Sequence, residues 1–282
     1  MKKFIASLLI VLVIITGAVS LFACSNKTED DSTLIGFDTE VARAVCEKLG
    51  IKASFQEIEW NTKEIELNGK SIDAIWNGMT LTEERSANMS MSVSYLVNKQ
   101  VLVFKTGSVL DGYISNPAAV TMVAEAGSAG EELYESQYKA AGFKYTSLTA
   151  QRDIFTEILS GTADIGIMDS VMANYYVNTD GSTFKGKIEI YSDLPVESET
   201  YAIGFRKGET MLTYKVNNAL YELQQEGKIS EIAEKYGLTS ALVAIEKPVE
   251  PTSDDGSWTY IQNKGTLIVG YTLFAPIAYK KD

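Results

Sequence analysis

Hydrophobic and polar residues alternate along the chain with two different periods, and the period changes repeatedly. Between residues 37 and 49 apolar side chains recur every four residues, which predicts an amphipathic helix that Gly50 ends. Ile51, Ala53 and Phe55 then alternate with polar residues, as on a half-buried strand. The two patterns continue, with strands expected at 72–76, 101–104, 121–124, 164–168 and 201–205 and helices at 154–159, 170–177, 211–226 and 229–236. This alternation predicts an α/β fold with mostly parallel sheets.

The first residues have the pattern of an export signal. Two lysines precede an almost wholly apolar run at 4–19. The tetrapeptide at 21–24 resembles a bacterial lipobox, which implies a lipoprotein leader at 1–24 and a diacylated Cys24 as the mature N-terminus. An uncleaved membrane anchor is the alternative, because the apolar run approaches the roughly 20 residues that a membrane span needs. The polar residues at 25–32 predict a flexible tether.

Composition narrows the range of functions. The chain has 282 residues, no histidine, and 37 acidic against 25 basic residues, for a net charge of −12. The lack of histidine excludes Ser-His-Asp and Cys-His triads and histidine-dependent zinc sites. An acidic chain of this kind is a poor binder of nucleic acid. With Cys24 lipidated, Cys46 has no disulfide partner, and its apolar helical surroundings predict a buried core thiol.

Three segments carry a resemblance to a known family. They are Leu34–Asp38, Asp73–Arg85 with its Gly-x-Thr-x-Thr-x-Glu-Arg core, and Gly161–Asp169. Together they resemble the polar amino-acid-binding proteins of bacterial ABC importers, and the similarity extends from residue 34 to 236. The resemblance implies a periplasmic-binding-protein-like fold of two α/β lobes that close on a ligand. The two β-strand crossovers between the lobes are expected near Val101–Lys105 and Tyr201–Phe205.

The order of the segments departs from that family. Its members begin with a Leu-x-Val-Gly strand and an aromatic, proline-bearing ligand loop, whereas here the matching segment is Gly265–Pro276, near the end of the chain. We therefore expect a circular permutation in which the final strand lies centrally in the first lobe. A domain-swapped dimer and the start of a second module are the alternatives. The expected organisation is a first part of lobe 1 at 33–103, lobe 2 at 104–201, a second part of lobe 1 at 202–246, a linker at 247–256 and a permuted part of lobe 1 at 257–282.

The first lobe contains the expected receiver of a ligand carboxylate. An amino-acid zwitterion needs one group for its carboxylate and another for its ammonium, and the planar guanidinium of Arg85 can donate two parallel hydrogen bonds to one carboxylate. Family resemblance points to the same residue. Thr80 is expected to add a hydroxyl, and the backbone at Gly78 and Met79, next to Asn77, close polar contacts. A surface arginine and an ordinary strand-end threonine are the structural alternatives.

The second lobe is expected to complete the zwitterion site. The small residues Ser128, Ala129 and Gly130 precede a helical stretch, and unpaired N–H groups at such a turn attract anions. Their match to the family segment implies a second contact to the ligand carboxylate. Asp169 ends an apolar strand, and the resemblance implies that it receives the α-ammonium. The alternative for Asp169 is a helix N-cap for 170–176.

Aromatic residues are expected to enclose the ligand. Trp60 and Phe274 match positions where the family stacks rings on the ligand. Tyr271, also expected in the site, and Thr272 occupy the place where several relatives carry an aspartate that reads the ligand side chain. The missing carboxylate argues against Lys, Arg or His as the preferred ligand.

The pattern as a whole favours a receptor over an enzyme. The expected function is the extracytoplasmic substrate-binding component of an amino-acid ABC importer, lipid-anchored to the cell membrane, monomeric, without metal or cofactor, delivering a free amino acid to a permease. An enzyme on the same fold, similar to cyclohexadienyl dehydratase, would need a pocket acid or base that nothing in the sequence singles out. A ligand-sensing module of a signalling system would require a membrane span and an output domain.

Overall fold

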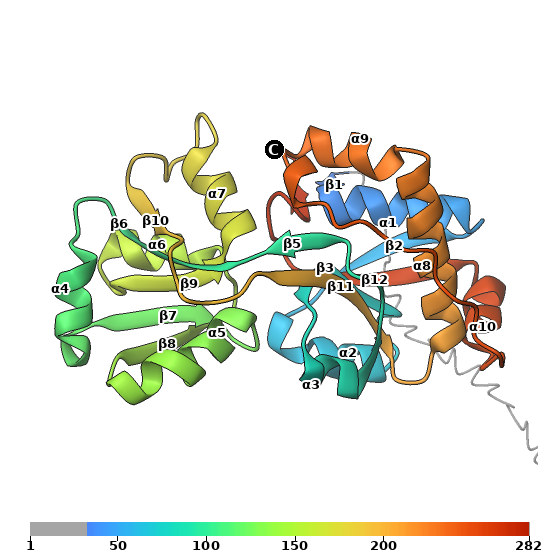
Figure 1. Cartoon of the computed structure of the whole chain (residues 1–282), viewed down its shortest axis with the longest axis horizontal. Coiled ribbons are helices and arrows are strands. Elements are labelled where there is room, and N and C mark those ends of the chain that lie inside the picture. The colour runs from blue at the N-terminus through green and yellow to red at the C-terminus, as the bar shows by residue number, and fades with distance from the viewer. Residues whose placement is uncertain (1–32, 282) are drawn as a thin grey trace, which may run out of the picture.

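Two large β-sheets, each covered by helices, form two lobes that lie side by side (Figure 1). This computed structural model describes residues 33–281, so the predicted leader, the tether and Cys24 lie outside the described residues. Among residues 33–281, no helix is long and apolar enough to span a membrane.

Lobe 1 is built from both ends of the described chain. Its sheet has six strands, with β2-β12-β3-β11-β4 in order and β5 paired to β11. The N-terminal elements are β1 (Leu34–Ile35), α1 (Phe37–Lys48), β2 (Lys52–Glu57), α2 (Lys63–Asn68), β3 (Ala74–Thr80), α3 (Glu83–Asn88), β4 (Met89–Met91) and β5 (Leu96–Asn98). The C-terminal elements are β11 (Glu199–Arg206), α8 (Thr210–Gln225), α9 (Lys228–Lys235), α10 (Ser257–Lys264), β12 (Thr266–Tyr271) and β13 (Tyr279–Lys280).

Lobe 2 contains the middle of the chain around a five-stranded sheet in the order β10-β6-β9-β7-β8. Its elements are β6 (Gln100–Lys105), α4 (Leu110–Ser115), β7 (Thr121–Glu125), α5 (Ala129–Leu133), β8 (Lys144–Leu148), α6 (Asp153–Ser160), β9 (Ile165–Asp169), α7 (Ser170–Asn178) and β10 (Ile188–Tyr191). Strand β7 is parallel to β8 and β9, whereas β6 is antiparallel to β9 and β10. In lobe 1, β11 is likewise antiparallel to β3. Both sheets are therefore mixed and not mostly parallel as expected, because β6 and β11 each enter from the other lobe.

The chain passes between the lobes earlier than predicted at both crossovers. The first crossing lies between Asn98 at the end of β5 and Gln100 at the start of β6, since β5 pairs in lobe 1 and β6 pairs in lobe 2. The second crossing precedes Glu199, because all of β11 belongs to the sheet of lobe 1. The apolar runs at 101–105 and 201–205 are thus strands within the lobes.

Strand β12, in the segment expected to lie centrally, does lie in the middle of the sheet of lobe 1. Strand β12 lies between β2 and β3 and is parallel to both, with Val269 opposite Phe55 on one side and Ala74 on the other. Leu267 and Val269 are fully buried, while Ile268 points to the opposite face and is half-buried. In Figure 1, β12 is the red strand in the sheet of lobe 1.

The segment after β12 also completes the start of α1. The N–H groups of Phe37 and Asp38 donate to the carbonyls of Pro276 and Ile277 at 2.8 and 3.0 Å, which satisfies two donors that a helix start leaves open. Gly36 makes this approach possible: its φ is +127°, and a Cβ at that position would lie 2.3 Å from the Ile277 carbonyl oxygen. The two ends of the described chain are thereby held together.

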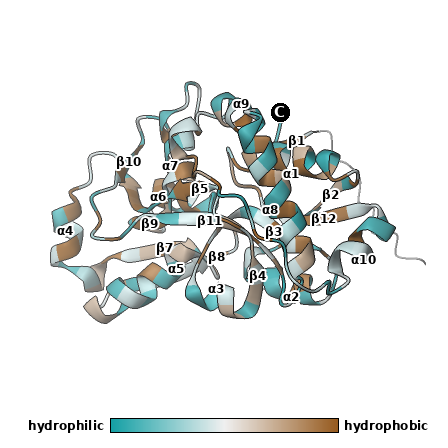
Figure 2. Ribbon diagram, turned by 45° about the vertical axis from the view of Figure 1, so that its right-hand side comes forward, coloured by the Kyte–Doolittle hydropathy of each residue, from teal (hydrophilic) through white to brown (hydrophobic). Residues whose placement is uncertain are grey.

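The hydrophobic pattern read from the sequence accounts for the core. Phe37, Val41 and Val45 are buried on one face of α1, and Cys46 is buried beside them as expected. Figure 2 shows hydrophobic residues concentrated on the strands inside each lobe and hydrophilic residues on the outer helices such as α2 and α5. The burial of these apolar side chains supplies the main stabilisation of each lobe.

The expected linker at 247–256 ends in a helix cap for α8. The carboxylate of Asp255 accepts hydrogen bonds from the backbone N–H groups of Thr210 and Met211 at 2.6 and 3.0 Å, and from the Thr210 hydroxyl. Ser257 Oγ accepts from the N–H of Leu212 at 2.9 Å. Partial burial works against ionisation of Asp255, but hydrogen bonds from Ser257, Thr210 and the backbone hold its pKa below the usual value.

Loss of this cap is expected to destabilise lobe 1. Asp255→Ala should lower the free energy of unfolding by about 0.5–2 kcal/mol, the range measured for N-cap replacements, without changing ligand contacts. Glu246→Ala, an exposed change near the same linker, should leave stability within about 0.5 kcal/mol of the parent. Urea unfolding followed by circular dichroism compares the two, and equal stability of both variants would show that Asp255 does not anchor the linker.

Candidate ligand-binding site

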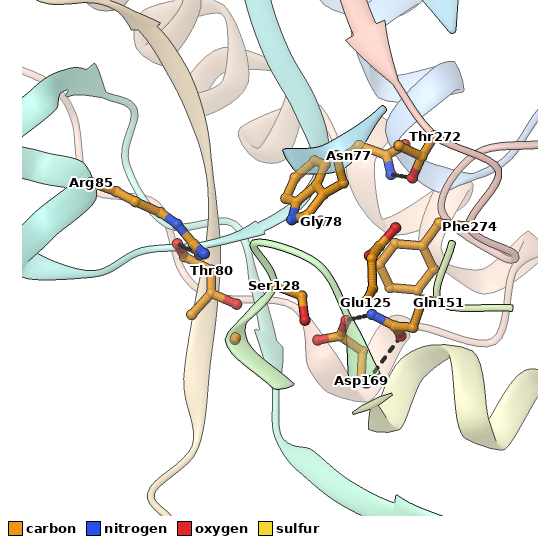
Figure 3. Close-up of a pocket in the computed structure, with 12 residues that line it drawn as sticks. Asn77, Gly78, Thr80, Arg85, Glu125, Ser128, Gln151, Asp169, Thr272 and Phe274 are labelled. Atoms are coloured by element: carbon orange, nitrogen blue, oxygen red, sulfur yellow. Dashed lines mark hydrogen bonds between the residues drawn. The ribbon is translucent and has the colours of Figure 1, made fainter. Parts of the chain in front are cut away.

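A small cavity lies between the lobes and receives side chains from both. The residues from lobe 1 are Trp60, Asn77, Gly78, Thr80, Arg85, Thr272 and Phe274, and those from lobe 2 are Glu125, Ser128, Ala129, Gln151 and Asp169 (Figure 3). Most of the predicted site residues are among them.

Three of the predicted residues do not line the cavity. The side chain of Met79 packs in an apolar cluster with Ile75 and Met89 and does not reach the cavity. Gly130 lies against β9, where a Cβ would be 2.9 Å from the Ile167 carbonyl oxygen, so it permits α5 to approach the sheet. Tyr271 is buried in the core of lobe 1, with its ring 6.3 Å from that of Phe55.

Arg85 is held in the cleft by its own segment. The helix α3 that carries it begins at Thr82, whose hydroxyl accepts from the Arg85 N–H at 3.1 Å. The guanidinium is buried and donates through Nη1 to the carbonyl of Thr80 at 2.8 Å. Its Nη2 reaches Glu132 of lobe 2 at 2.8 Å. A fixed, buried guanidinium of this kind suits a ligand carboxylate, and it is not the surface arginine of the alternative interpretation.

Gly78 brings the backbone of β3 against the cavity. Its φ is +61°, and a Cβ would lie 2.8 Å from the ring of Phe274, so a larger residue would close this side of the site. The Gly78 N–H donates to the buried carboxyl of Asp38 at 2.7 Å, and the Tyr95 hydroxyl donates to the same oxygen at 2.8 Å. Burial raises the pKa of Asp38 to about 7, and these two hydrogen bonds oppose the shift.

Asp169 is a buried carboxyl at the end of β9. It accepts hydrogen bonds from Gln151 at 2.6 Å, from Gln100 at 2.9 Å and from Asn98. Gln151 also receives the backbone N–H of Asp169 at 3.1 Å and so fixes both parts of the residue. Asp169 precedes α7 but makes no side-chain capping bond, which argues against the N-cap alternative. Burial raises its pKa, while the Gln151 bond acts in the opposite direction.

A second acid lies behind Asp169 at the second crossover. Glu199, the first residue of β11, accepts from Gln100 at 2.8 Å and from Asn98, the same two amides that contact Asp169. Burial and the charge of Asp169 raise the pKa of Glu199 to about 7. Asp169 and Glu199 therefore share two amide donors, and no lysine or arginine among residues 33–281 forms an ion pair with either acid.

Ser128 begins α5 and acts as its N-cap. Its hydroxyl oxygen accepts from the Glu131 N–H at 3.2 Å, and Glu131 in turn accepts from the Gly127 N–H at 2.7 Å. The hydroxyl hydrogen of Ser128 is left to donate to a ligand. Figure 3 places Ser128 between Arg85 on one side and Asp169 on the other.

The rims of the two lobes are in contact beside the cavity. Lys63 of α2 donates to the Gly127 carbonyl of lobe 2 at 3.0 Å and to the Trp60 carbonyl at 3.2 Å, and Arg85 also reaches the Gly127 carbonyl. Burial, with the charge of Arg85 in second place, lowers the pKa of Lys63 to about 8. The loop that begins α5 is thus held by two cations of the opposite lobe.

Sequence reasoning did not include Glu125 and Gln151 in the site, and it named Thr272 only for its place near a family aspartate. Glu125 is the last residue of β7, and a polar residue at the carboxyl end of a parallel strand was the available signal. Gln151 lies in a loop before α6 and offered none. Thr272 follows β12 and accepts a hydrogen bond from Asn77 at 3.0 Å.

Comparison with known proteins agrees with this geometry. The family described as bacterial extracellular solute-binding proteins, family 3, matches residues 15–239. The chain is 28% identical over 210 residues to the arginine-binding extracellular protein ArtP of Bacillus subtilis, covering 74% of this chain and 80% of that protein. It is 27% identical over 208 residues to the L-cystine-binding protein TcyA of the same organism, covering 74% of each.

Solved structures give the same result. An ABC uptake transporter substrate binding protein from Streptococcus pneumoniae, determined with bound histidine, superposes with a TM-score of 0.66 at 31% identity, covering 78% of this chain and 89% of that one. All three relatives are described as binding proteins, which supports the prediction of a binding protein and not an enzyme. The match over residues 15–239 and the common two-lobed fold show that this chain belongs to the bacterial extracellular solute-binding proteins of family 3.

Proposed function

We propose that this protein is the extracytoplasmic substrate-binding component of an amino-acid ABC importer and that its lobes close on one free amino acid. One observation carries the proposal: a single small cavity holds a buried guanidinium, Arg85, from lobe 1 and a buried carboxyl, Asp169, from lobe 2. A zwitterion with an α-carboxylate and an α-ammonium complements this pair. Binding it requires both lobes, so the ligand itself favours closure.

The remaining lining residues fit the same ligand. Ser128 can donate to the α-carboxylate that Arg85 receives, and Thr80 offers a hydroxyl from the adjacent strand end. Trp60 and Phe274 provide apolar ring surface for the carbon atoms of the ligand. Among the relatives, ArtP is named for arginine, TcyA for cystine, and the pneumococcal protein holds histidine. Free amino acids are the chemistry common to all three.

A receptor of this kind delivers its ligand to a membrane permease, and we place it outside the cytoplasm at the cell membrane. The leader pattern at 1–24 and the lipobox-like tetrapeptide support lipid anchoring through Cys24. We further propose that the chain is circularly permuted relative to its family. The family match ends at residue 239, before β12, and β12 occupies a central position in lobe 1.

A thermal-shift panel of the twenty amino acids and cystine tests the function. At 100 times its dissociation constant, a ligand should stabilise the protein by about 2.7 kcal/mol, a shift of several degrees. Asp169→Asn is the matched control, because it keeps the size of the side chain and removes the charge that the α-ammonium needs, so its shift should be lost. No shift with any member of the panel would contradict the proposed function.

A further inference from the structure

Glu125 is a buried acid in the cavity that recognition of the zwitterion does not use. It projects from the end of β7 in lobe 2, its side chain lines the cavity, and it is 5% exposed. Within residues 33–281, no lysine or arginine forms an ion pair with it. Lys63 acts on Glu125 through its charge, but the Lys63 ammonium is bonded to two backbone carbonyls of the rim.

The cavity wall contributed by lobe 1 adds hydrogen-bond acceptors near this acid. Asn77 is buried and lines the cavity. Its amide nitrogen donates to the Thr272 hydroxyl, whereas its oxygen Oδ1 has no hydrogen-bond partner. Figure 3 shows the Glu125 carboxyl directed toward Asn77 and Thr272, on the side of the cavity away from Arg85. A buried acceptor without a donor is unfavourable, so this region is built to receive donors from a ligand.

A count of charges in the cavity separates this region from the zwitterion site. Three charged residues line the cavity: Arg85, which can receive the α-carboxylate, Asp169, which can receive the α-ammonium, and Glu125, which has no part in binding the α-groups. We propose that Glu125 and the Asn77 oxygen form a side-chain subsite that selects a ligand with a second cation, that is, an amino acid with a guanidinium or ammonium side chain. The inference rests on the proposed function and names its substrate class.

The electrostatics of the cavity and its aromatic lining favour a ligand with a cationic side chain over one with a neutral side chain. Burial and the charge of Asp169 raise the pKa of Glu125 to about 8, even though Lys63 acts in the opposite direction. A ligand cation beside this carboxyl would stabilise its ionised form. The ring of Phe274 lines the same cavity and can face a cation favourably. The family aspartate missing near residues 271–272 does not leave the cavity without an acid, because Glu125 supplies one from the other lobe.

Matched pairs of ligands test the subsite by calorimetry. Arginine against citrulline, and lysine against N6-acetyllysine, differ in side-chain charge but keep the α-groups that Arg85 and Asp169 receive. The charged member of at least one pair should bind 30-fold or more tightly, about the effect of one desolvated charge pair. If neutral amino acids bind equally well or better, the cation subsite is wrong while the proposed function stands. If no amino acid binds, the proposed function itself fails.

The variant Glu125→Gln assigns the preference to this residue. It should weaken binding of the charged ligand by about 30-fold or more and leave the neutral partner within a few-fold of the parent protein. Glu135→Gln on the surface of lobe 2 makes the same change in net charge away from the cavity and should alter neither affinity. A preference for charged ligands that survives Glu125→Gln unchanged would overturn the assignment.

Discussion

Removal of Gly265–Asp282 is expected to abolish both the folding of lobe 1 and ligand binding. The deletion takes away β12, which pairs with β2 and β3, and with it the buried side chains of Leu267, Val269 and Ile277. Truncating one buried leucine or isoleucine typically costs about 2–5 kcal/mol, so losing several exceeds the usual stability of a domain, about 5–15 kcal/mol. Thermal unfolding should show no cooperative transition for lobe 1, and calorimetry no binding.

A rearranged chain provides the control for that deletion. Placing residues 257–282 before Thr33, after the tether, restores the strand in the order found in the family, and should recover both folding and affinity. The termini allow this change, because the segment after β12 already contacts the start of α1. A deletion variant that folds and binds with unchanged affinity would show that the tail is an accessory, and a protein that is always dimeric would favour strand exchange between copies.

Arg85→Ala should weaken ligand binding far more than Thr80→Ala. Removing one member of a desolvated charge pair costs about 2–5 kcal/mol, whereas loss of a neutral hydroxyl costs about 0.5–1.5 kcal/mol. The guanidinium also joins the lobes through Glu132, so its removal loosens the closed arrangement as well. Calorimetry with the best ligand of the panel ranks the two variants, and a larger loss with Thr80→Ala would contradict the role given to the arginine.

Arg85→Lys distinguishes shape from charge at the same position. Lysine keeps the positive charge but cannot donate two parallel hydrogen bonds to one carboxylate. It also cannot contact the Thr80 carbonyl and a ligand in the fixed geometry that the guanidinium allows. We therefore expect intermediate affinity. Binding as tight as that of the parent protein would show that two-pronged recognition is not what Arg85 contributes.

Much of lobe 1 could be predicted from sequence because its signals are local. The helix expected at 37–49 is α1 at 37–48, since a run of apolar residues every four positions needs only one face of the core. The central position of β12 followed from a missing strand at the other end of the chain. Arg85 and Asp169 were identified because the residues around each form a recognisable motif.

The remaining features depend on contacts between distant segments. The sheet that β6 joins is decided by its pairing with β9 and β10, and nothing in its own sequence fixes the point where the chain leaves lobe 1. The sequence shows Glu125 only as a polar residue at the end of a strand. Its position in the cavity depends on the pairing of β7 with β8 and β9, which brings the end of β7 to the cavity. Gln151 becomes a site residue only through its two hydrogen bonds to Asp169.

Calorimetry with one amino acid and two of its derivatives tests the central claim most directly. The best ligand of the panel is compared with its decarboxylated amine, which lacks the group for Arg85, and with its N-acetyl form, which lacks the charge for Asp169. Each derivative loses one desolvated charge pair, so each should bind at least about 30-fold more weakly than the amino acid. Affinities equal to that of the amino acid for both derivatives would contradict recognition of a zwitterion between the two lobes.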